Sequence, residues 1–297
     1  MNFDGIYTAM VTPFDADGRL DLAAFRKLLE AQIAGGVSGV VICGTTGESP
    51  ALDMSEKHTL VKTALDVTSG TNVSTLVGTG SNHTPLTIEF SKWASDQGVA
   101  GVLVVTPYYS KPTQAGLRDH FLAVADEIDC DLVLYNVPGR TAVTITPGTV
   151  AHLAQHPRIT ALKDATGDIG YAEEVLDELI ANDVQMSVLS GDDPSLLAHM
   201  AIGGKGSVSV ASNIIPAQMV AMHKAVMAND INSAREINSK YYTLFRDLFV
   251  ETNPAPIKYA LSLSGYCQSV LRHPLAQMEP VNVEKLRKTL NHVGLPS

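Results

Sequence analysis

The sequence of 297 residues predicts a (β/α)₈ barrel, or TIM barrel, with a C-terminal extension of three helices. Two observations predict this fold. Apolar runs alternate with stretches of helical spacing through about the first 225 residues, which suits the size of such a barrel. Polar residues follow nearly every run, whereas a doubly wound open sheet gathers them at one switch point, often beside a G-x-G-x-x-G turn. The open sheet is therefore the second choice.

Eight apolar runs have the length and composition of parallel strands that are covered on both faces. Each is rich in Val, Ile or Leu, or in other β-branched residues, and stops at residues that favour turns. The predicted strands are residues 6–11, 39–43, 73–77, 101–105, 131–135, 159–162, 186–189 and 206–210.

The stretches between the strands carry helix signals. Residues 21–36 end at a pair of glycines, residues 55–70 open on Ser55, and residues 89–98 close on Gly98. These signals predict that a helix follows each strand.

No strand pattern follows about residue 225. Residues 231–250, 253–265 and 281–290 have helical spacing instead. We therefore expect a barrel domain over residues 1–225 and a helical domain over residues 226–297, whose helices we expect to form subunit contacts.

Composition excludes several classes of function. The net charge of −10, the pI near 5.3 and the lack of a Lys/Arg run argue against nucleic-acid binding. No apolar stretch approaches the roughly 20 residues that cross a bilayer, and the N-terminus has no signal segment. Cys43, Cys130 and Cys267 are odd in number and far apart, so neither disulfides nor a thiolate metal site is expected. We expect a cytoplasmic enzyme that acts on small molecules.

In a barrel of this kind the chemistry lies in the loops that follow the strands. These loops are expected to form a polar surface at the C-terminal ends of the strands. One of them begins with Lys163, at the end of an apolar run. The loops are residues 12–14, 44–49, 78–82, 106–112, 136–141, 163–168, 190–193 and 211–213.

Lys163 is the candidate nucleophile. Alternation along a strand places Ile159, Ala161 and Lys163 on one face, and the small Ala161 leaves room for the lysine inside. An amine among apolar strands is poorly solvated as a cation, and only the neutral amine attacks a carbonyl to form a Schiff base. The alternative is a lysine that bends outward and pairs with Asp164 or Asp168.

Two further segments favour the catalytic interpretation. Tyr135 ends the fifth strand on the face of Val133, where its phenol can lie over the lysine nitrogen and exchange protons. The alternative for Tyr135 is an aromatic core residue. The turn "GTTGES" places Thr45 and Thr46 between glycines, where backbone N–H groups can hold a carboxylate and the hydroxyls can extend a proton relay.

Three strings in this order and spacing, "GTTGES", "YNVPGRT" and "KDATG", resemble the dihydrodipicolinate synthase (4-hydroxy-tetrahydrodipicolinate synthase) family. This family belongs to the pyruvate-dependent class I aldolases, which also include N-acetylneuraminate lyase. The resemblance covers essentially the whole chain, from "GIYTAMVTPF" through "VTPYYSKP" and "LSGDD" to "NPAPIKYAL".

The resemblance implies an aldolase-type condensation of pyruvate with L-aspartate 4-semialdehyde in lysine and diaminopimelate biosynthesis. It implies that Lys163 forms the Schiff base and that Tyr135, Thr45 and Tyr109 form the proton relay. Tyr109 comes from a neighbouring subunit in the family, so we expect at least a dimer, commonly within a homotetramer. No metal or organic cofactor is expected, because the lysine iminium serves as the electron sink.

The resemblance also implies the substrate contacts. Thr46 matches the position that binds the pyruvate carboxylate, and Arg140 the one that receives the carboxylate of aspartate semialdehyde, which suits a guanidinium fork. The alternative for Arg140 is a rim arginine paired with a surface acid. Gly191 and Val208 match positions whose backbone lines the pocket.

Other functions stay open at this point. One is an aldolase for a 2-keto-3-deoxy sugar acid or sialic acid, although that branch tends to have an apolar version of "PGR" and a "KFT" type in place of "KDATG". Another is a phosphate-binding barrel isomerase in which Lys163 acts as a charge. A barrel without catalytic activity is more distant.

Some of the positions that bind the inhibitor lysine in part of the family carry different residues in this sequence. Lysine-inhibited synthases of one bacterial type have histidines and a glutamate at positions that match Met54, Lys57 and Leu86, although Asn82 and Tyr108 keep the pattern. A bound lysine would lack several charge-assisted contacts. We expect weak or absent inhibition by lysine.

The remaining motifs are assigned structural roles. His152 and His156 have helical spacing, but no Glu follows the first His and no third ligand is apparent, so a surface helix is expected. "GGKGS" at residues 203–207 lacks the spacing of a phosphate loop. Asp192 and Asp193 are expected to be first-turn acids of a helix.

Overall fold

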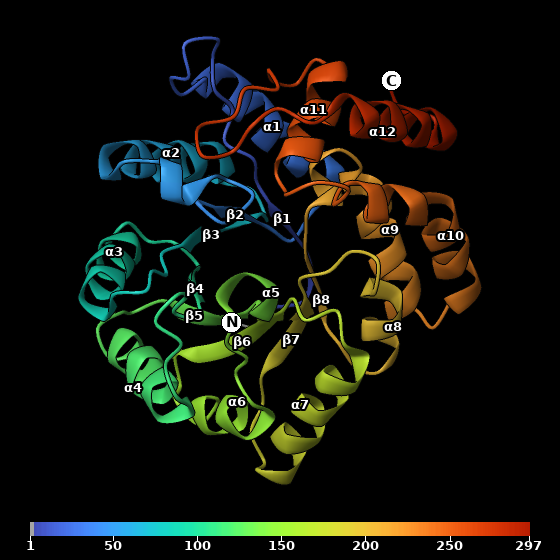
Figure 1. The fold of residues 1–297 in the computed structure, drawn as a ribbon. Helices are drawn as coiled ribbons and strands as arrows, with labels where there is room; N and C mark the ends of the chain where they lie inside the picture. The colour runs from blue at the N-terminus through green and yellow to red at the C-terminus, as the bar shows by residue number, and fades with distance from the viewer. Residues whose placement is uncertain (1–2) are drawn as a thin grey trace. The chain divides into compact units, whose positions relative to one another are not determined.

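The computed structural model describes residues 3–297, and within them eight parallel strands close into a barrel in chain order (Figure 1). The predicted TIM barrel is confirmed. The strands are β1 (Gly5–Ala9), β2 (Gly39–Ile42), β3 (Ser74–Gly78), β4 (Gly101–Val105), β5 (Asp131–Asn136), β6 (Ile159–Asp164), β7 (Ser187–Ser190) and β8 (Gly206–Ser209).

Helices follow the strands, and the last three form the predicted extension. The helices that follow strands are α1 (Leu22–Gly35), α2 (Met54–Thr68), α3 (Thr84–Asp96), α4 (Gln114–Ala125), α5 (Pro138–Thr141), α6 (Pro147–Leu153), α7 (Ile169–Ala181), α8 (Leu196–Ala201) and α9 (Pro216–Met227). The extension contains α10 (Ile231–Asp247), α11 (Ala255–Leu263) and α12 (Pro280–Val293). Short 3₁₀ turns lie at Ser49–Ala51 and Ala211–Asn213.

Caps set the helix ends. Asp21 accepts a hydrogen bond from the backbone N–H of the first turn of α1, and Gly36 ends that helix in the left-handed region with φ of 76°. α2 begins before the predicted Ser55 because Asp53 caps it. Asp53 accepts from the N–H of Glu56 at 2.9 Å, and the Glu56 side chain accepts from the N–H of Asp53 at 3.1 Å, which makes a capping box.

The strands are buried on both faces, as their continuous apolar runs predict. On β4, Val102 and Val104 are 0% exposed and the intervening Leu103 is 3% exposed. Consecutive residues of a strand point to opposite faces. Side chains therefore cover both faces of β4, as in the parallel sheets of α/β proteins.

β6 differs from its prediction in two ways. It runs to Asp164 rather than residue 162, because Lys163 and Asp164 still pair with β5 and β7. Its register against β5 shifts near its start, where Ile159 and Ala161 pair with consecutive residues of β5. The shift interrupts the regular alternation at Thr160, so the prediction that Ile159 shares the face of Lys163 stays a prediction. Ala161 and Lys163 lie two residues apart in the regularly paired part of the strand and share one face.

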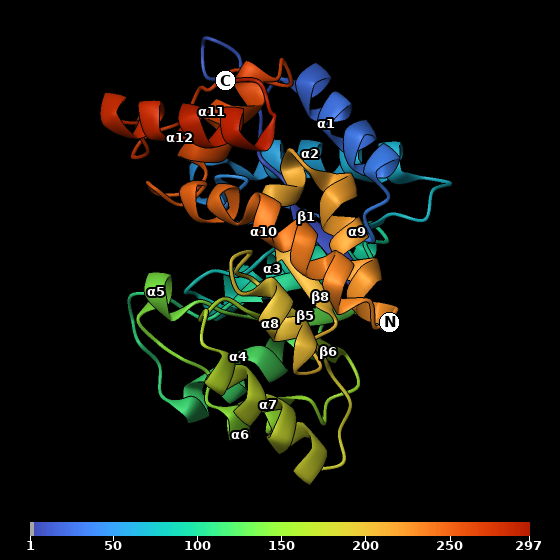
Figure 2. The same ribbon diagram turned by 90° about the vertical axis from the view of Figure 1, so that its right-hand side faces the viewer.

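Described separately, the chain forms two compact units. One contains residues 3–5 and 74–208, in which α4 packs against α3 and α6, and α6 against α7. The other contains residues 6–73 and 209–297, in which α10 packs between α9 and α12, as Figure 2 also shows. The boundary between residues 225 and 226 stays a prediction.

Among the described residues, no helix is long and apolar enough to span a membrane. All three cysteines are free thiols.

Candidate active site

Lys163 and Tyr135 lie side by side on neighbouring strands. They are register partners of β6 and β5, and the Lys163 Nζ lies 4.1 Å from the centroid of the Tyr135 ring. Lys163 is 7% exposed and Tyr135 is 6% exposed. The predicted adjacency is therefore present, and the pairing of the two strands produces it. The amine is largely shielded from water, with the negative face of an aromatic ring beside it.

The acids near Lys163 in the sequence have other partners. Asp164 accepts hydrogen bonds from the N–H and hydroxyl of Thr166 at 3.0 and 2.8 Å. Asp168 caps α7 by accepting from backbone N–H groups of its first turn. Burial raises the pKa of Asp164, and the nearby charges of Asp168 and Asp192 add to that rise. Across residues 3–297 no carboxylate forms an ion pair with Lys163, so the outward, paired lysine is not the arrangement observed.

Gly191 leaves space for the lysine side chain. It directly follows β7, and a Cβ at this position would lie 2.9 Å from the Lys163 Cε and 2.7 Å from the Ala165 Cβ. Carbon atoms in contact prefer separations of about 3.5–4.0 Å, so a side chain here would displace its neighbours. Val208 lies on β8 and is 1% exposed. The resemblance gave Gly191 only a backbone role, and the structure adds the need for a small residue beside Lys163.

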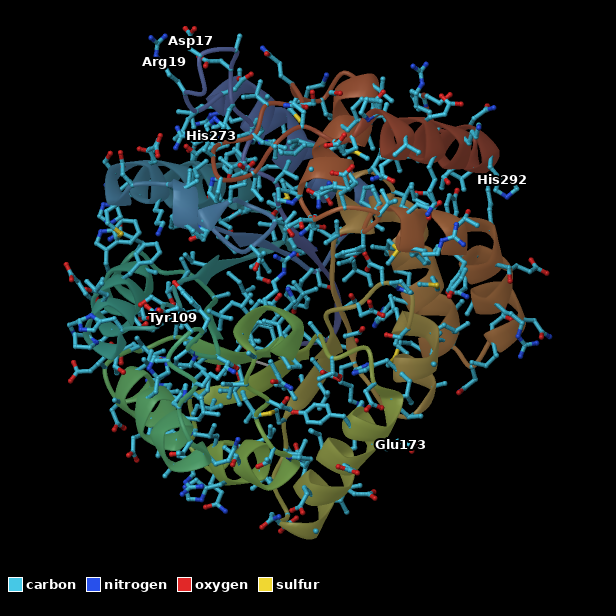
Figure 3. All side chains as sticks on the ribbon, viewed as in Figure 1. Asp17, Arg19, Tyr109, Glu173, His273 and His292 are labelled. Carbon is cyan, nitrogen blue, oxygen red and sulfur yellow. The ribbon has the colours of Figure 1, made fainter. Side chains whose placement is uncertain are left out.

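Tyr109, which is labelled in Figure 3, lies in the loop after β4. It is 91% exposed, and its φ of 71° lies in the left-handed region that few residues other than glycine adopt. Within one chain, Tyr109 is too exposed to pack against the buried Tyr135 and Lys163.

Arg140 lies in α5, a short helix that begins with Pro138 after β5. Arg140 is exposed to solvent. The chain around α5 is anchored at both ends. The Asn136 Oδ1 accepts from the N–H of Ile145 at 3.1 Å, and the Tyr171 hydroxyl donates to the Ile145 carbonyl at 2.7 Å. Burial raises the pKa of Tyr171 above its ordinary value, so this phenol stays a donor. Arg140 is thus an exposed cation on a fixed loop.

The GTTGES turn after β2 belongs to the second compact unit. It is closed by hydrogen bonds from the N–H of Gly47 to the Gly44 carbonyl and from the N–H of Glu48 to the Thr45 carbonyl, each 3.1 Å long. Thr45 is half-buried and Thr46 is buried. Glu48 adopts a left-handed φ of 54°, which is uncommon outside glycine, asparagine and aspartate.

The turn is held by residues that sequence reasoning did not single out. The Asn253 Nδ2 donates to the Thr46 Oγ1 at 2.9 Å. The Lys258 Nζ donates to the Glu48 Oε1 at 2.6 Å, and both of these charged side chains are 0% exposed. Burial lowers the pKa of Lys258, although the adjacent Glu48 opposes this shift. The only sequence signal was a lysine on the apolar side of "NPAPIKYAL", which periodicity alone does not distinguish from a surface lysine.

These contacts gather the predicted site residues in two groups. In one unit, Lys163 pairs with Tyr135 and lies close to Gly191. Thr46 is joined to Asn253 in the other.

The motifs set aside as structural do not form a metal site. α6 ends at Leu153, so His152 and His156 do not share a helical face as predicted. His152 is exposed, and the His156 Nε2 lies 3.2 Å from the Asp126 Oδ1. No cluster of His, Cys, Asp or Glu suited to a metal ion occurs in the part of the chain that the structure describes.

The prediction for Asp192 and Asp193 is wrong in detail. α8 begins at Leu196, and its first turn holds no acidic residue. Asp192 instead accepts from the N–H of Ser195 at 3.0 Å, in the turn before the helix. A side chain that bonds a backbone N–H locally stabilises such a turn.

Comparisons with known proteins agree on one family. The model of the dihydrodipicolinate synthetase family matches residues 2–293. A 4-hydroxy-tetrahydrodipicolinate synthase of Syntrophotalea carbinolica is 43% identical over 293 residues, which cover 99% of each chain. The crystal structure of the dihydrodipicolinate synthase of Thermotoga maritima is 38% identical, with a TM-score of 0.96 over 99% of each chain. That of the Acinetobacter baumannii enzyme complexed with pyruvate is 38% identical, with a TM-score of 0.95, and the match covers 98% of this chain and 99% of that one.

Proposed function

Because this chain belongs to the dihydrodipicolinate synthetase family, we propose that Lys163 is the amine that carries pyruvate as a Schiff base. The activity is that of a 4-hydroxy-tetrahydrodipicolinate synthase, a lyase that condenses pyruvate with L-aspartate 4-semialdehyde. One observation carries the proposal for Lys163: its amine is buried against Tyr135 and forms no ion pair with a carboxylate in residues 3–297.

The Lys163 Nζ attacks the C2 carbonyl of pyruvate, and the resulting carbinolamine loses water to give an iminium. The iminium withdraws electrons, so the pyruvate methyl group loses a proton and becomes an enamine. The enamine carbon then attacks the aldehyde of aspartate semialdehyde and forms the new carbon–carbon bond. The amino group of the adduct displaces the Lys163 Nζ by transimination, which closes the ring and frees the lysine. The lysine supplies the electron sink, so the reaction as written calls for no cofactor.

Tyr135, Thr45 and Tyr109 are proposed to move the protons in these steps. The loss of water from the carbinolamine needs a proton donor at the departing hydroxyl, and a phenol can donate and then recover that proton. The ring of Tyr135 at 4.1 Å from the Lys163 Nζ supports its part. Thr45 is assigned by its place in the GTTGES turn, and Tyr109 by its place in "TPYY".

The substrate carboxylates are assigned to separate groups. Thr46 binds the pyruvate carboxylate through the GTTGES turn, and Gly191 and Val208 line the pocket. Arg140 receives the carboxylate of aspartate semialdehyde, because its guanidinium can donate two parallel hydrogen bonds. Support comes from the exposed position of Arg140 on the anchored loop after β5 and from the close approach of Gly191 to Lys163.

The active assembly is proposed to be a homotetramer in which each Tyr109 serves the site of a neighbouring subunit. An aromatic side chain that is 91% exposed and held in a left-handed conformation suits a contact with another chain. The cytoplasm is proposed as its location, which the free thiols of Cys43, Cys130 and Cys267 support.

Reductive trapping tests the role of Lys163. Sodium borohydride reduces an iminium to a stable secondary amine, so incubation with pyruvate and borohydride should add the mass of a reduced pyruvate unit to Lys163. Lys163→Arg, which keeps the charge but cannot form this adduct, should give none and should lose activity by several orders of magnitude. A wild-type protein without the adduct would contradict the proposal and favour an isomerase in which Lys163 is only a charge.

A coupled assay with different aldehyde substrates distinguishes the synthase from the sugar-acid aldolases of the same group. We expect turnover with aspartate semialdehyde and little with the aldehydes derived from sugar acids. The opposite preference would assign the chain to the sugar-acid branch.

A further inference from the structure

We propose that Asn253 is a positioning residue for the pyruvate carboxylate, that it acts through Thr46, and that the chain after the barrel is thereby part of the active site. The proposal rests on the role proposed for Thr46 in binding pyruvate. Its basis is the hydrogen bond of 2.9 Å from the Asn253 Nδ2 to the Thr46 Oγ1. Asn253 is 5% exposed and Thr46 is 3% exposed, so water competes little for this bond.

The direction of this hydrogen bond decides what Thr46 offers to a substrate. A hydroxyl can donate one hydrogen and accept through its lone pairs. Because the amide of Asn253 donates to the Thr46 oxygen, the hydroxyl hydrogen is directed to some other acceptor. A carboxylate can only accept hydrogen bonds, so it is the complementary ligand. Asn253 therefore makes Thr46 a donor.

A second contact from the same segment fixes the GTTGES turn. The Lys258 Nζ, in the first half of α11, donates to the Glu48 Oε1 at 2.6 Å and to the Thr12 carbonyl at 2.9 Å. The other carboxylate oxygen of Glu48 accepts from the backbone N–H of Arg272 at 3.0 Å. Both oxygens of Glu48 are thus held by residues that follow the barrel. Glu48 needs this support, because its left-handed backbone is costly for a residue with a side chain.

Burial makes this arrangement rigid. The side chains of Lys258 and Glu48 are 0% exposed, and the Lys258 Nζ also lies 4.3 Å from the centroid of the Phe14 ring. Separating two buried charges would leave each without a partner in a poorly solvating interior. The turn therefore has little freedom to move, and Thr46 is held where Asn253 reaches it. Such fixed geometry matters because small displacements of a binding group cause large losses of rate.

The helices after the barrel were expected to form subunit contacts. Asn253 lies just before α11 and Lys258 lies within it, and both contact the GTTGES turn in the same compact unit. This start of the extension therefore has a role inside one chain, separate from any subunit contact.

Two substitutions of Asn253 test the direction of the hydrogen bond. Asn253→Ala removes the donor and should raise the KM for pyruvate about tenfold, with a smaller change in kcat and in the KM for aspartate semialdehyde. Asn253→Asp keeps the size but accepts the hydrogen of Thr46 and adds a negative charge. It should raise the KM for pyruvate about a hundredfold or more, and slow trapping by borohydride at low pyruvate concentration.

A double-mutant cycle tests whether Asn253 acts through Thr46. Thr46→Val alone removes the hydroxyl, so Asn253→Ala added to Thr46→Val should raise the KM for pyruvate little further. The matched control is Asn282→Ala in the same extension. The Asn282 Nδ2 donates to the Glu251 Oε1 at 2.8 Å, so this variant loses a similar amide bond and should bind pyruvate like the wild type.

The outcomes are separable. If folded Asn253→Ala and Asn253→Asp both bind pyruvate like the wild type, or if the effects of Asn253→Ala and Thr46→Val add fully, the proposal is wrong. If Asn253→Ala does not fold, Asn253→Asp decides alone, because its side chain has nearly the same size. A wild-type protein that forms no pyruvate adduct would instead contradict the proposed function.

Discussion

Gly191 has a hydrogen atom at the position where every other residue has its Cβ. A Cβ there would lie 2.9 Å from the Lys163 Cε, so the lysine or the chain near Ala165 must shift to admit it. We expect Gly191→Ala to slow trapping of pyruvate on Lys163 by about tenfold to a hundredfold, since a displacement near 1 Å can cost that much. The measurement is the rate of adduct formation under borohydride.

Gly148→Ala is the control for this prediction. A Cβ at Gly148 would meet no atom within 4 Å, so this variant should trap pyruvate at the wild-type rate. Wild-type trapping by Gly191→Ala would show that the site tolerates the added carbon.

The role proposed for Arg140 concerns the binding of aspartate semialdehyde and not that of pyruvate. Arg140→Ala should lower kcat/KM for aspartate semialdehyde by about a hundredfold, the usual scale for a lost charge-assisted pair, and leave the pyruvate adduct largely intact. Steady-state kinetics with each substrate varied, together with trapping, would check this. Arg140→Lys should recover only part of the loss, because an ammonium lacks the planar fork. Equal loss of both half-reactions would count against the assigned role.

Among the secondary-structure elements, the presence of each strand was predicted more accurately than the residues at which the strand begins and ends. The ends of β6 are set by the register with β5 and β7, which carries Lys163 and Asp164 into the ladder. The register shift at Thr160 has the same origin. A single strand carries no information about where its neighbours stop pairing, so neither feature could be predicted locally.

Two helices carry the positions that bear on regulation. Met54 is the first residue of α2 and is 44% exposed, and Leu86 lies in α3 and is 57% exposed. Neither side chain can form the charge-assisted bonds that a lysine ammonium or carboxylate requires. We expect weak or absent inhibition by free lysine in a steady-state assay with pyruvate and aspartate semialdehyde. Strong inhibition by millimolar or lower lysine would refute this.

For the whole molecule, buried histidines set a limit on acid stability. His120 and His199 are 4% and 2% exposed, and burial lowers the pKa of each from 6.5 to about 4. The unfolded chain therefore binds more protons than the folded chain between these values. The stability that neutral histidine contributes is complete above pH 6.5 and is lost as the pH falls toward 4.

The expected loss can be measured by denaturation. Between pH 7.5 and pH 5, each of these histidines should lower the free energy of unfolding by roughly 2 kcal/mol. His199→Gln, which cannot titrate, should flatten the pH dependence relative to the wild type. His152→Gln, at an exposed position, is the matched control for the change from histidine to glutamine itself. Equal slopes for wild type and His199→Gln would contradict the prediction.

The barrel and the candidate lysine could both be predicted from the order of the amino acids alone. Both depend on local patterns: apolar runs at regular intervals predict strands, and an amine at the end of such a run is unusual enough to be noticed. The neighbouring Tyr135 followed from the order of strands in a barrel, because consecutive strands pair. The motif strings then identified the family.

The groups that meet across long sequence separations could be identified only from the folded chain. The bond between Asn253 and Thr46, the buried pair of Lys258 and Glu48, and the approach of Gly191 to Lys163 all join segments that no local pattern connects. Hydrophobic periodicity reports which side of an element is buried, but not which atoms it is buried against. A buried lysine and a surface lysine look alike in the sequence, and their chemistry differs because of the partners that folding brings to them.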